Sequence, residues 1–272
     1  MSTERDGLQI QQQGAVRTLT LARAARKNAL TPALGWALVA AVDAAAQDDS
    51  VRVLVITGGE PGGAFCSGAD LARPEGGEDP NPQSPQDQHL DDVDWIGQFL
   101  LAIRVRCDKP VIAAVNGVAV GAGVALALCA DLRIAAESAM LHPGYIRAGT
   151  SPDGGLSWTL TTLLGHEAAL RFLWDPRMVP APEAQARGLV GTVVPDGDFS
   201  AVVAQEAERL AALAPIGVRQ TKRLVVRASL GADLAGQLRD ELAYVRRGLS
   251  SEDGKEAVRA IFEKRTPTFH GR

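Results

Sequence analysis

Two glycine-bearing turns contain the small residues that chemistry on a carbonyl compound needs. The first, GGAFCSGADL at residues 62–71, and the second, NGVAVGAGVA at residues 116–125, each follow an apolar run rich in strand-forming residues. Glycine lets a backbone approach a ligand closely, and amides at the start of a helix point outward toward an anion. Two such turns on neighbouring strands would bring two N–H donors to one oxygen, which is what an oxyanion hole requires. The pattern therefore predicts a site that stabilises negative charge on an oxygen.

The second turn taken alone also suggests a dinucleotide-binding loop. Gly117, Gly121 and Gly123 follow a predicted strand, but their spacing is not G-x-G-x-x-G. No acidic residue lies about 20 residues beyond Gly121 to hold a ribose. We therefore favour the oxyanion interpretation.

The elements that must hold these turns alternate between strand and helix, and the last third of the chain is helical. This order predicts an α/β core with helical extensions. Thr31 and Pro32 form a strong helix-start signal. The expected strands are residues 8–12, 15–21, 51–57, 111–115, 132–135 and 192–194, and the main expected helices are residues 32–47, 95–107, 201–213, 216–229, 232–247 and 251–264.

Several motifs, including both turns, occur in an order that resembles the crotonase superfamily, the enoyl-CoA hydratase/isomerase group. The resemblance covers about residues 7–270. Its motifs are RKNALT at 26–31, AFCSGADL at 64–71, AAVNGVAVGAG at 113–123, CADLR at 129–133, GTSPDGG at 149–155, AQARGLV at 184–190 and EKRTPTF at 263–269. It implies a crotonase-like ββα spiral core over residues 1–200 and a helical trimerisation region over residues 201–272.

The resemblance also implies a substrate and a set of site residues. The substrate is an acyl-CoA thioester, and its enolate is stabilised by the N–H groups of Ala69 and Ala122. Coenzyme A is then part of the substrate, and no separate cofactor is expected. For Arg26 and Lys27, which would meet the CoA phosphates, the alternative is a solvated surface pair. The residues expected to bind substrate are Arg26, Lys27, Ala64, Gly68, Asp70, Leu71, Gly121, Gly123 and Tyr145.

The chain departs from the well-known hydratases at the two glutamates that hold the attacking water. Their positions correspond here to Ala125 and Tyr145. Hydration needs a base for the water while the α-carbon gains a proton, and neither a methyl group nor an ordinary phenol supplies that base at pH 7. We therefore expect slow hydration and favour isomerase-like or other single-base chemistry, such as hydrolysis. The rival hypothesis is a non-catalytic acyl-CoA binding or carrier protein.

Asp153 is the carboxylate that remains near the predicted site, and some members of the superfamily have a catalytic aspartate at the matching position. The alternative is that Asp153 only caps the following helix. If so, Asp87 or Asp91 would be the next candidate base. Tyr145 would either donate to a substrate oxygen or pack with its hydroxyl paired. His142 is expected to be structural, and Cys66 lacks the basic partner that a nucleophilic thiol needs.

Composition limits the other classes of function. The formal net charge of −4, with no basic stripe, argues against nucleic acid. The apolar run at residues 111–128 is interrupted by Asn116 and by glycines, so we expect no membrane helix. Three cysteines form no disulfide framework, and no metal-ligand spacing occurs.

We expect a cytoplasmic protein, and the resemblance implies a homotrimer or hexamer. The proline-rich, acidic residues 72–94 predict a surface loop, with a lid over the site as the alternative.

Overall fold

The computed structural model describes residues 2–59, 63–71 and 93–272 of the chain. Nearly all of the predicted loop at 72–94 therefore lies outside the described residues, and so do Asp87 and Asp91. Within the described ranges, no helix is long and apolar enough to cross a membrane. The fold is α/β, as predicted, and contains two sheets.

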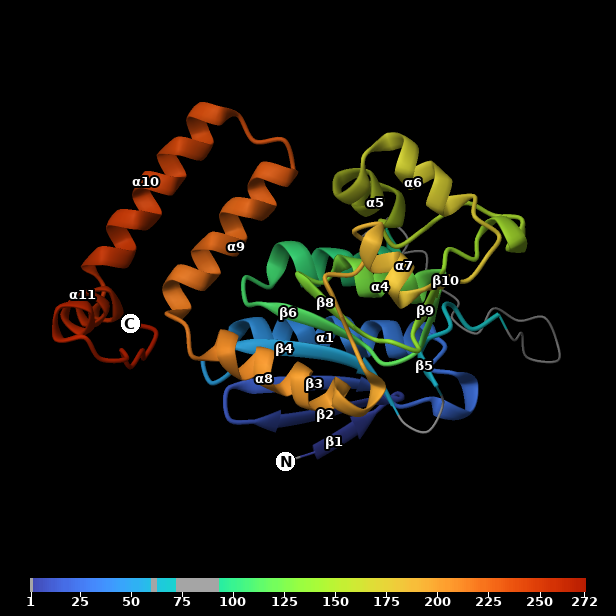
Figure 1. Cartoon of the computed structure of the whole chain (residues 1–272), viewed down its shortest axis with the longest axis horizontal. Helices are drawn as coiled ribbons and strands as arrows, with labels where there is room; N and C mark the ends of the chain where they lie inside the picture. Colours follow the sequence, from blue (N-terminus) through green and yellow to red (C-terminus); the bar gives the residue numbers. More distant parts are fainter. Residues whose placement is uncertain (1, 60–62, 72–92) are drawn as a thin grey trace, which may run out of the picture.

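A seven-stranded sheet forms the centre of the fold (Figure 1). Its order is β1-β2-β3-β4-β6-β8-β11, antiparallel from β1 to β3 and parallel from β3 to β11. The central strands β4 and β6 are almost entirely buried, as expected for parallel strands covered on both faces. The strands are β1 (Ser2–Arg5), β2 (Leu8–Gln13), β3 (Val16–Leu21), β4 (Val53–Gly58), β6 (Val111–Val115), β8 (Leu132–Ala136) and β11 (Thr192–Val194).

A second sheet has four short strands in the order β10-β9-β7-β5. From the sequence we expect residues 64–66 and 118–120 in glycine-rich turns, but they form β5 and β7. Strands of three residues are too short to show the alternation that identifies a strand. The members are β5 (Ala64–Cys66), β7 (Val118–Val120), β9 (Met140–His142) and β10 (Val179–Pro180).

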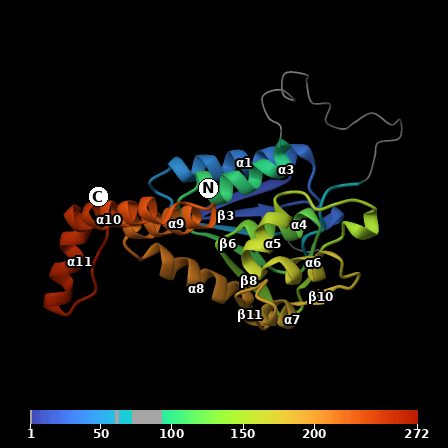
Figure 2. The ribbon, with the colours of Figure 1, turned by 90° about the horizontal axis from the view of Figure 1, so that it is seen from above.

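Helices cover both faces of the central sheet, with α1 and α3 on one side and α8 on the other (Figure 2). The expected helix at 95–107 consists of α3 and a π-helical stretch, η2 (Leu101–Arg106). The α-helices are α1 (Pro32–Gln47), α3 (Asp94–Leu100), α4 (Ala122–Cys129), α5 (Leu156–Leu164), α6 (His166–Leu173), α7 (Ala181–Ala186), α8 (Phe199–Ala211), α9 (Pro215–Ser229), α10 (Leu234–Ser250) and α11 (Glu252–Glu263).

Helix α1 shows how side chains complete the backbone hydrogen bonds at both of its ends. The Thr31 hydroxyl accepts a hydrogen bond from the amide of Leu34, and proline occupies the first helical position, as predicted. At the other end, the buried Lys109 ammonium donates to the carbonyls of Ala45 and Asp48 at 2.7 and 2.6 Å. A cation there satisfies free carbonyls and complements the helix dipole.

Helices α9, α10 and α11 project from one end of the core (Figures 1 and 2). The Lys222 ammonium of α9 donates to the carbonyls of Ile103 and Lys109, both at 2.9 Å, and lies 2.7 Å from the Asp131 carboxylate. These bonds fix α9 to the core. Helix α8 instead packs on the central sheet, and the division at residue 200 stays a prediction.

Candidate active site

The two predicted turns lie side by side because the strands before them are hydrogen-bonded neighbours. β5 and β7 run parallel, with Cys66 opposite Ala119, so both strands end at the same edge of the second sheet. A Cβ atom placed on Gly68 would lie 3.6 Å from the amide nitrogen of Ala122. The turn after β5 and the start of α4 are therefore in contact.

The amide of Ala69 is oriented by an isolated parallel bridge to Leu30. The amide of Leu30 donates to the Gly68 carbonyl, and the amide of Asp70 donates to the Leu30 carbonyl, both at 2.8 Å. In an extended segment, successive N–H groups point to opposite sides. Because Asp70 directs its N–H toward Leu30, the N–H of Ala69 points away from it.

Ala122 is the first residue of α4. Its N–H therefore has no acceptor within its own helix, where the first four amides lack intrahelical partners. The residue before it, Gly121, has a φ of +53°, in the region that favours glycine. The amide of Gly121 donates to the carbonyl of His142 at 3.0 Å. This bond to the end of β9 fixes the turn from which α4 starts.

Gly123 allows the two turns to pack closely. A Cβ atom on Gly123 would lie 2.1 Å from the Cys66 carbonyl oxygen, and a Cβ atom on Gly68 would lie 2.7 Å from the Val120 carbonyl oxygen. Both distances are shorter than any van der Waals contact, and both neighbours are backbone atoms with little freedom to move. Glycine at these positions is thus required for the packing of the protein itself.

Tyr145 joins the second turn to the predicted catalytic carboxylate. Its hydroxyl donates to Oδ1 of Asp153 at 2.6 Å, and its ring is buried. A Cβ atom placed on Gly121 would lie 3.9 Å from Cζ of Tyr145, at ordinary contact distance. The structure thus brings the 121–123 turn, the phenol and the carboxylate together, and Asp153 is exposed to solvent at this place.

Desolvation and the shared hydrogen bond change the pKa values of this pair. Partial burial raises the pKa of Asp153 above its ordinary 3.8, and the hydrogen bond from Tyr145 opposes that rise. Burial, followed by the hydrogen bond to Asp153 and its charge, raises the pKa of Tyr145 well above 10. At neutral pH the phenol is therefore protonated and is the donor of the pair, and the Asp153 carboxyl oxygen is the acceptor.

The structure contradicts the capping alternative for Asp153. Helix α5 begins at Leu156, its N-cap is Gly155, and no side chain caps it. Gly154 and Gly155 both have positive φ, so the helix starts after them, and the Asp153 carboxylate accepts no capping hydrogen bond from its first amides. The amide of Leu156 instead donates to the backbone carbonyl of Asp153 at 2.9 Å.

Ala125, at the first of the two hydratase glutamate positions, is 1% exposed. A Cβ atom on Gly154 would lie 3.1 Å from its methyl group and 2.9 Å from Cζ of Phe99. Close apolar packing therefore surrounds this position. The second position is Tyr145, whose hydroxyl already has a partner.

The predicted CoA-binding residues lie on the segment beside the first turn. Arg26 and Lys27 are both exposed. The guanidinium of Arg26 lies 2.9 Å from Oδ1 of Asp70, and that of Arg23 lies 2.9 Å from Oδ2 of the same carboxylate. Arg26 is therefore an exposed side chain that is ion-paired with Asp70. Leu71 is 80% exposed.

His142 and Cys66, for which we expect no catalytic role, are both buried in the structure. A ring nitrogen of His142, Nε2, lies 3.2 Å from the carbonyl oxygen of Pro176, and the side chain is buried at the end of β9. The Cys66 thiol is buried, and burial raises its pKa to about 12, so it is not a thiolate nucleophile at neutral pH. Cys107 and Cys129 are likewise free and buried.

Two asparagines position the turns, and we did not single them out from the sequence. The buried Asn28 amide donates to the Ala64 carbonyl at 2.8 Å, while its oxygen accepts from the amide of Arg23. Asn116 exchanges two hydrogen bonds with the backbone of Gly58. The signal was available in the quoted motifs, because a side-chain amide can replace backbone partners where strands end.

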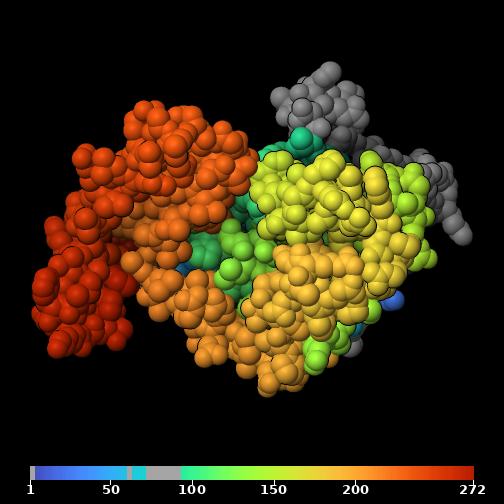
Figure 3. All heavy atoms as spheres, turned by 45° about the horizontal axis from the view of Figure 1, so that its top comes forward, coloured from blue at the N-terminus to red at the C-terminus, as the bar shows by residue number. Residues whose placement is uncertain are grey.

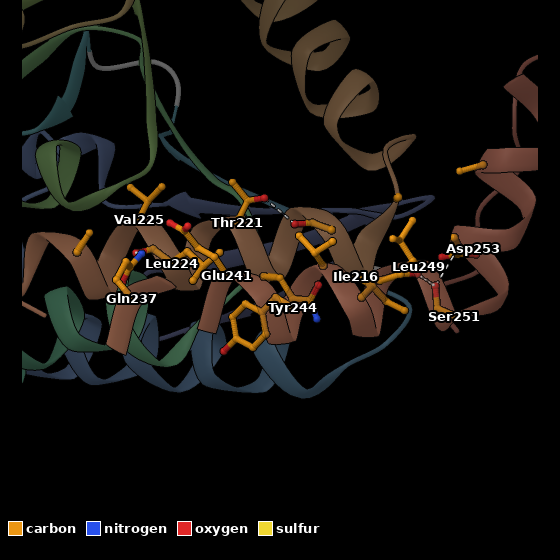
Figure 4. Close-up of a pocket in the computed structure, with 18 residues that line it drawn as sticks. Ile216, Thr221, Leu224, Val225, Gln237, Glu241, Tyr244, Leu249, Ser251 and Asp253 are labelled. Atoms are coloured by element: carbon orange, nitrogen blue, oxygen red, sulfur yellow. Dashed lines mark hydrogen bonds between the residues drawn. The ribbon is translucent and has the colours of Figure 1, made fainter. Parts of the chain in front are cut away.

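A separate hollow lies among α9, α10 and α11 (Figure 4). Its volume is about 800 Å³, and none of the predicted site residues lines it. In the space-filling view, these helices (orange to red) form a lobe beside the yellow and green surface (Figure 3). The hollow is mainly apolar, and its walls include Ile216, Leu224, Val225, Tyr244, Val245 and Leu249.

Comparisons with known proteins agree with this architecture. A solved enoyl-CoA hydratase from Polaromonas sp. JS666 superposes with a TM-score of 0.85 at 34% identity, covering 96% of this chain and 99% of that one. The sequence is 34% identical to the 2,3-dehydroadipyl-CoA hydratase of Escherichia coli K12 (97% of this chain, 98% of that one). It is 33% identical to the 1,2-epoxyphenylacetyl-CoA isomerase of the same organism (94% and 95%).

The fold defines the class: a crotonase-type α/β protein, as the sequence predicts. The profile of the enoyl-CoA hydratase/isomerase family matches residues 11–272. The chain therefore belongs to the enoyl-CoA hydratase/isomerase family of enzymes, whose members process acyl-CoA compounds.

Proposed function

We propose that the protein binds an acyl-CoA thioester and converts it through an enolate, with Asp153 as a single acid–base group. The observation that carries this proposal is the hydrogen bond between Tyr145 and Asp153, which places a carboxylate beside the Gly121 turn. In the proposed complex, the N–H groups of Ala69 and Ala122 bind the thioester oxygen. They stabilise the charge that develops there when the neighbouring carbon loses a proton.

The proposed reaction class is migration of a double bond. Asp153 takes a proton from a carbon conjugated to the thioester, and the electron pair of the broken C–H bond moves into the enolate. The same carboxyl group then returns the proton to another carbon, and the double bond shifts. No atom is gained or lost, and the base returns to its starting state. One base is enough, whereas hydration also needs a group to activate water.

Two features support isomerisation over hydration. Ala125 has no titratable atom and is closely packed, and the Tyr145 hydroxyl already donates to Asp153. Neither position can activate a water molecule as a carboxylate does. The isomerase among the relatives belongs to the same family as the hydratases, so the family does not select between the two reactions.

The proposed substrate path runs from the 64–71 segment to Asp153. The CoA adenosine would lie along this segment, near Asp70 and Leu71, and its phosphates would meet Arg26 and Lys27. The exposure of both basic side chains supports this placement. Asp70 holds Arg26 in position, so its own carboxylate is a support for the cation and not a contact to phosphate.

We also propose that the chain assembles into a trimer, or a hexamer built from trimers, through its C-terminal helices. Leu238, Leu242, Val245 and Leu249 of α10 are all more than half exposed. Their spacing of four, three and four residues places them on one face of the helix. A contiguous apolar face of this kind is normally covered by a partner.

The three free thiols agree with a reducing, cytoplasmic compartment.

A screen of CoA thioesters, with turnover and binding measured in parallel, tests the proposed function. Unsaturated acyl-CoA compounds should be isomerised, whereas crotonyl-CoA should be hydrated very slowly. Binding of thioesters without any turnover would contradict the proposal and favour the acyl-CoA carrier. Rapid hydration of crotonyl-CoA by the pure protein would contradict the single-base mechanism.

A further inference from the structure

Tyr145 contacts two parts of the proposed site at once. Its ring packs against Gly121, which precedes the second proposed oxyanion donor, and its hydroxyl donates to Oδ1 of Asp153 at 2.6 Å. The side chain is buried, whereas Asp153 is exposed. The hydrogen bond from this buried donor holds Oδ1 of a residue that is open to solvent, so the carboxylate has a fixed orientation where a substrate could reach it.

On this geometry, and resting on the proposed function, we infer that Tyr145 is a positioning residue for Asp153. Its hydroxyl does not bind the thioester, which differs from the substrate-binding role expected from the sequence. A phenol has a single proton to donate, and that proton is already bonded to Asp153. Tyr145 therefore acts on the reaction through the carboxylate, by fixing its orientation and favouring its ionised form.

The surroundings of the pair contain few other titratable groups. Among the described residues, those that influence the pKa of Tyr145 are Asp153 and the Cys66 thiol of β5. For Asp153 they are Tyr145 and its own backbone amide. Cys66 is neutral at ordinary pH, and apolar Phe99 packs beside Gly154. Removing the Tyr145 hydroxyl therefore acts mainly on Asp153.

A phenol titration tests the hydrogen bond without any substrate. Tyr145 and Tyr244 are the two tyrosines of the chain, so Tyr244→Phe leaves Tyr145 as the sole phenol. Near-ultraviolet absorbance, followed over the pH range in which circular dichroism shows a folded protein, should then show a phenol that stays protonated well above the ordinary value of about 10. Adding Asp153→Asn should lower that midpoint, because the carboxylate charge no longer opposes the phenolate. A midpoint that Asp153→Asn leaves unchanged would overturn the inference.

Kinetics of Tyr145→Phe test the positioning role on a substrate that the screen identifies. Loss of the donor raises the pKa of Asp153, so the acidic limb of kcat/KM should move to higher pH. We expect kcat to fall roughly tenfold or more, the effect of losing one hydrogen bond to a charged group, with KM nearly unchanged. In an Asp153→Asn background, Tyr145→Phe should have little further effect.

Tyr244→Phe is the matched control for folding and activity, and circular dichroism melting would show that each variant is folded. A raised KM with an unmoved acidic limb would make Tyr145 a substrate contact and overturn the inference. If no thioester is turned over, the proposed function fails. The phenol titration still decides whether Tyr145 and Asp153 are coupled, so the two failures are distinguishable.

Discussion

Gly123, which the motif places beside a substrate, is also required for the packing of the two turns. From the motif we expect glycine there because a thioester must approach the backbone. The structure adds that a Cβ atom would lie 2.1 Å from the Cys66 carbonyl oxygen. The motif identifies the turn, but only the spatial pairing of β5 and β7 shows which atom would meet the side chain.

Gly123→Ala should therefore destabilise the protein as well as lower its activity. Relieving the overlap requires the two turns to separate, and such overpacking costs about 1–3 kcal/mol or more. Gly197→Ala is the control, since Gly197 has no neighbour within 4 Å and no positive φ, and it should change stability by about 0.5 kcal/mol at most. Equal unfolding free energies for the two variants in urea would refute this account of the turn.

The Asp153 carboxyl should also control the pH dependence of turnover. The proposed reaction needs the ionised form, and partial burial raises the pKa of Asp153 above 3.8. As the pH falls, kcat/KM should therefore decline at a higher pH than an ordinary aspartate would produce. A pH profile of kcat/KM, with circular dichroism to exclude acid unfolding, measures this directly. An acidic limb at or below the ordinary value would contradict a raised pKa.

At the scale of elements, the sequence predicts the long periodic segments and misses the short ones. The Thr31 cap, the β-branched run of β4 and the C-terminal helices have patterns long enough to identify. The three-residue strands β5 and β7 do not, although they position the proposed oxyanion turns. The sequence also does not show that two consecutive glycines with positive φ separate Asp153 from the start of α5. The sequence therefore indicates Asp153 and Tyr145 individually but not the hydrogen bond between them.

Helix α9 depends on a buried cation for its attachment to the core. Lys222→Met leaves two carbonyl oxygens and the Asp131 carboxylate without this donor, which should cost about 1.5–3 kcal/mol. Hydrogen exchange should show the loss of protection mainly in α9. Arg246→Met, on the exposed surface of α10, is the control. If both substitutions lower the free energy of unfolding equally, the lysine is not an anchor.

At the scale of the whole molecule, the C-terminal lobe leaves an apolar face on α10 that the described chain does not cover. A trimer would bury it. Light scattering at micromolar concentration should give about three or six times the 28.6 kDa of one chain. The double variant Leu242→Glu and Val245→Glu should dissociate, because it places charges in the apolar contact.

Arg246→Glu, which alters a neighbouring exposed position of the same helix, should leave the assembly intact. A wild-type protein that scatters as a monomer would contradict the assembly proposal. The contact between Tyr145 and Asp153 would not be contradicted by that result, because both residues belong to one chain.

In the proposed mechanism, one carboxylate, that of Asp153, moves a proton next to a thioester whose oxygen is held by two amides. Exchange of that proton in D₂O tests this mechanism. NMR would follow the incorporation of deuterium into a bound acyl-CoA. The wild type should exchange the acidic C–H. Asp153→Asn should slow exchange by roughly 10²–10⁴-fold. It should not lower stability at neutral pH. A carboxyl whose pKa is raised in the folded state contributes stability at low pH, and that contribution is lost as the pH rises through the folded-state pKa. Exchange that Asp153→Asn leaves undiminished, or a wild type that binds the thioester without exchanging it, would contradict the account.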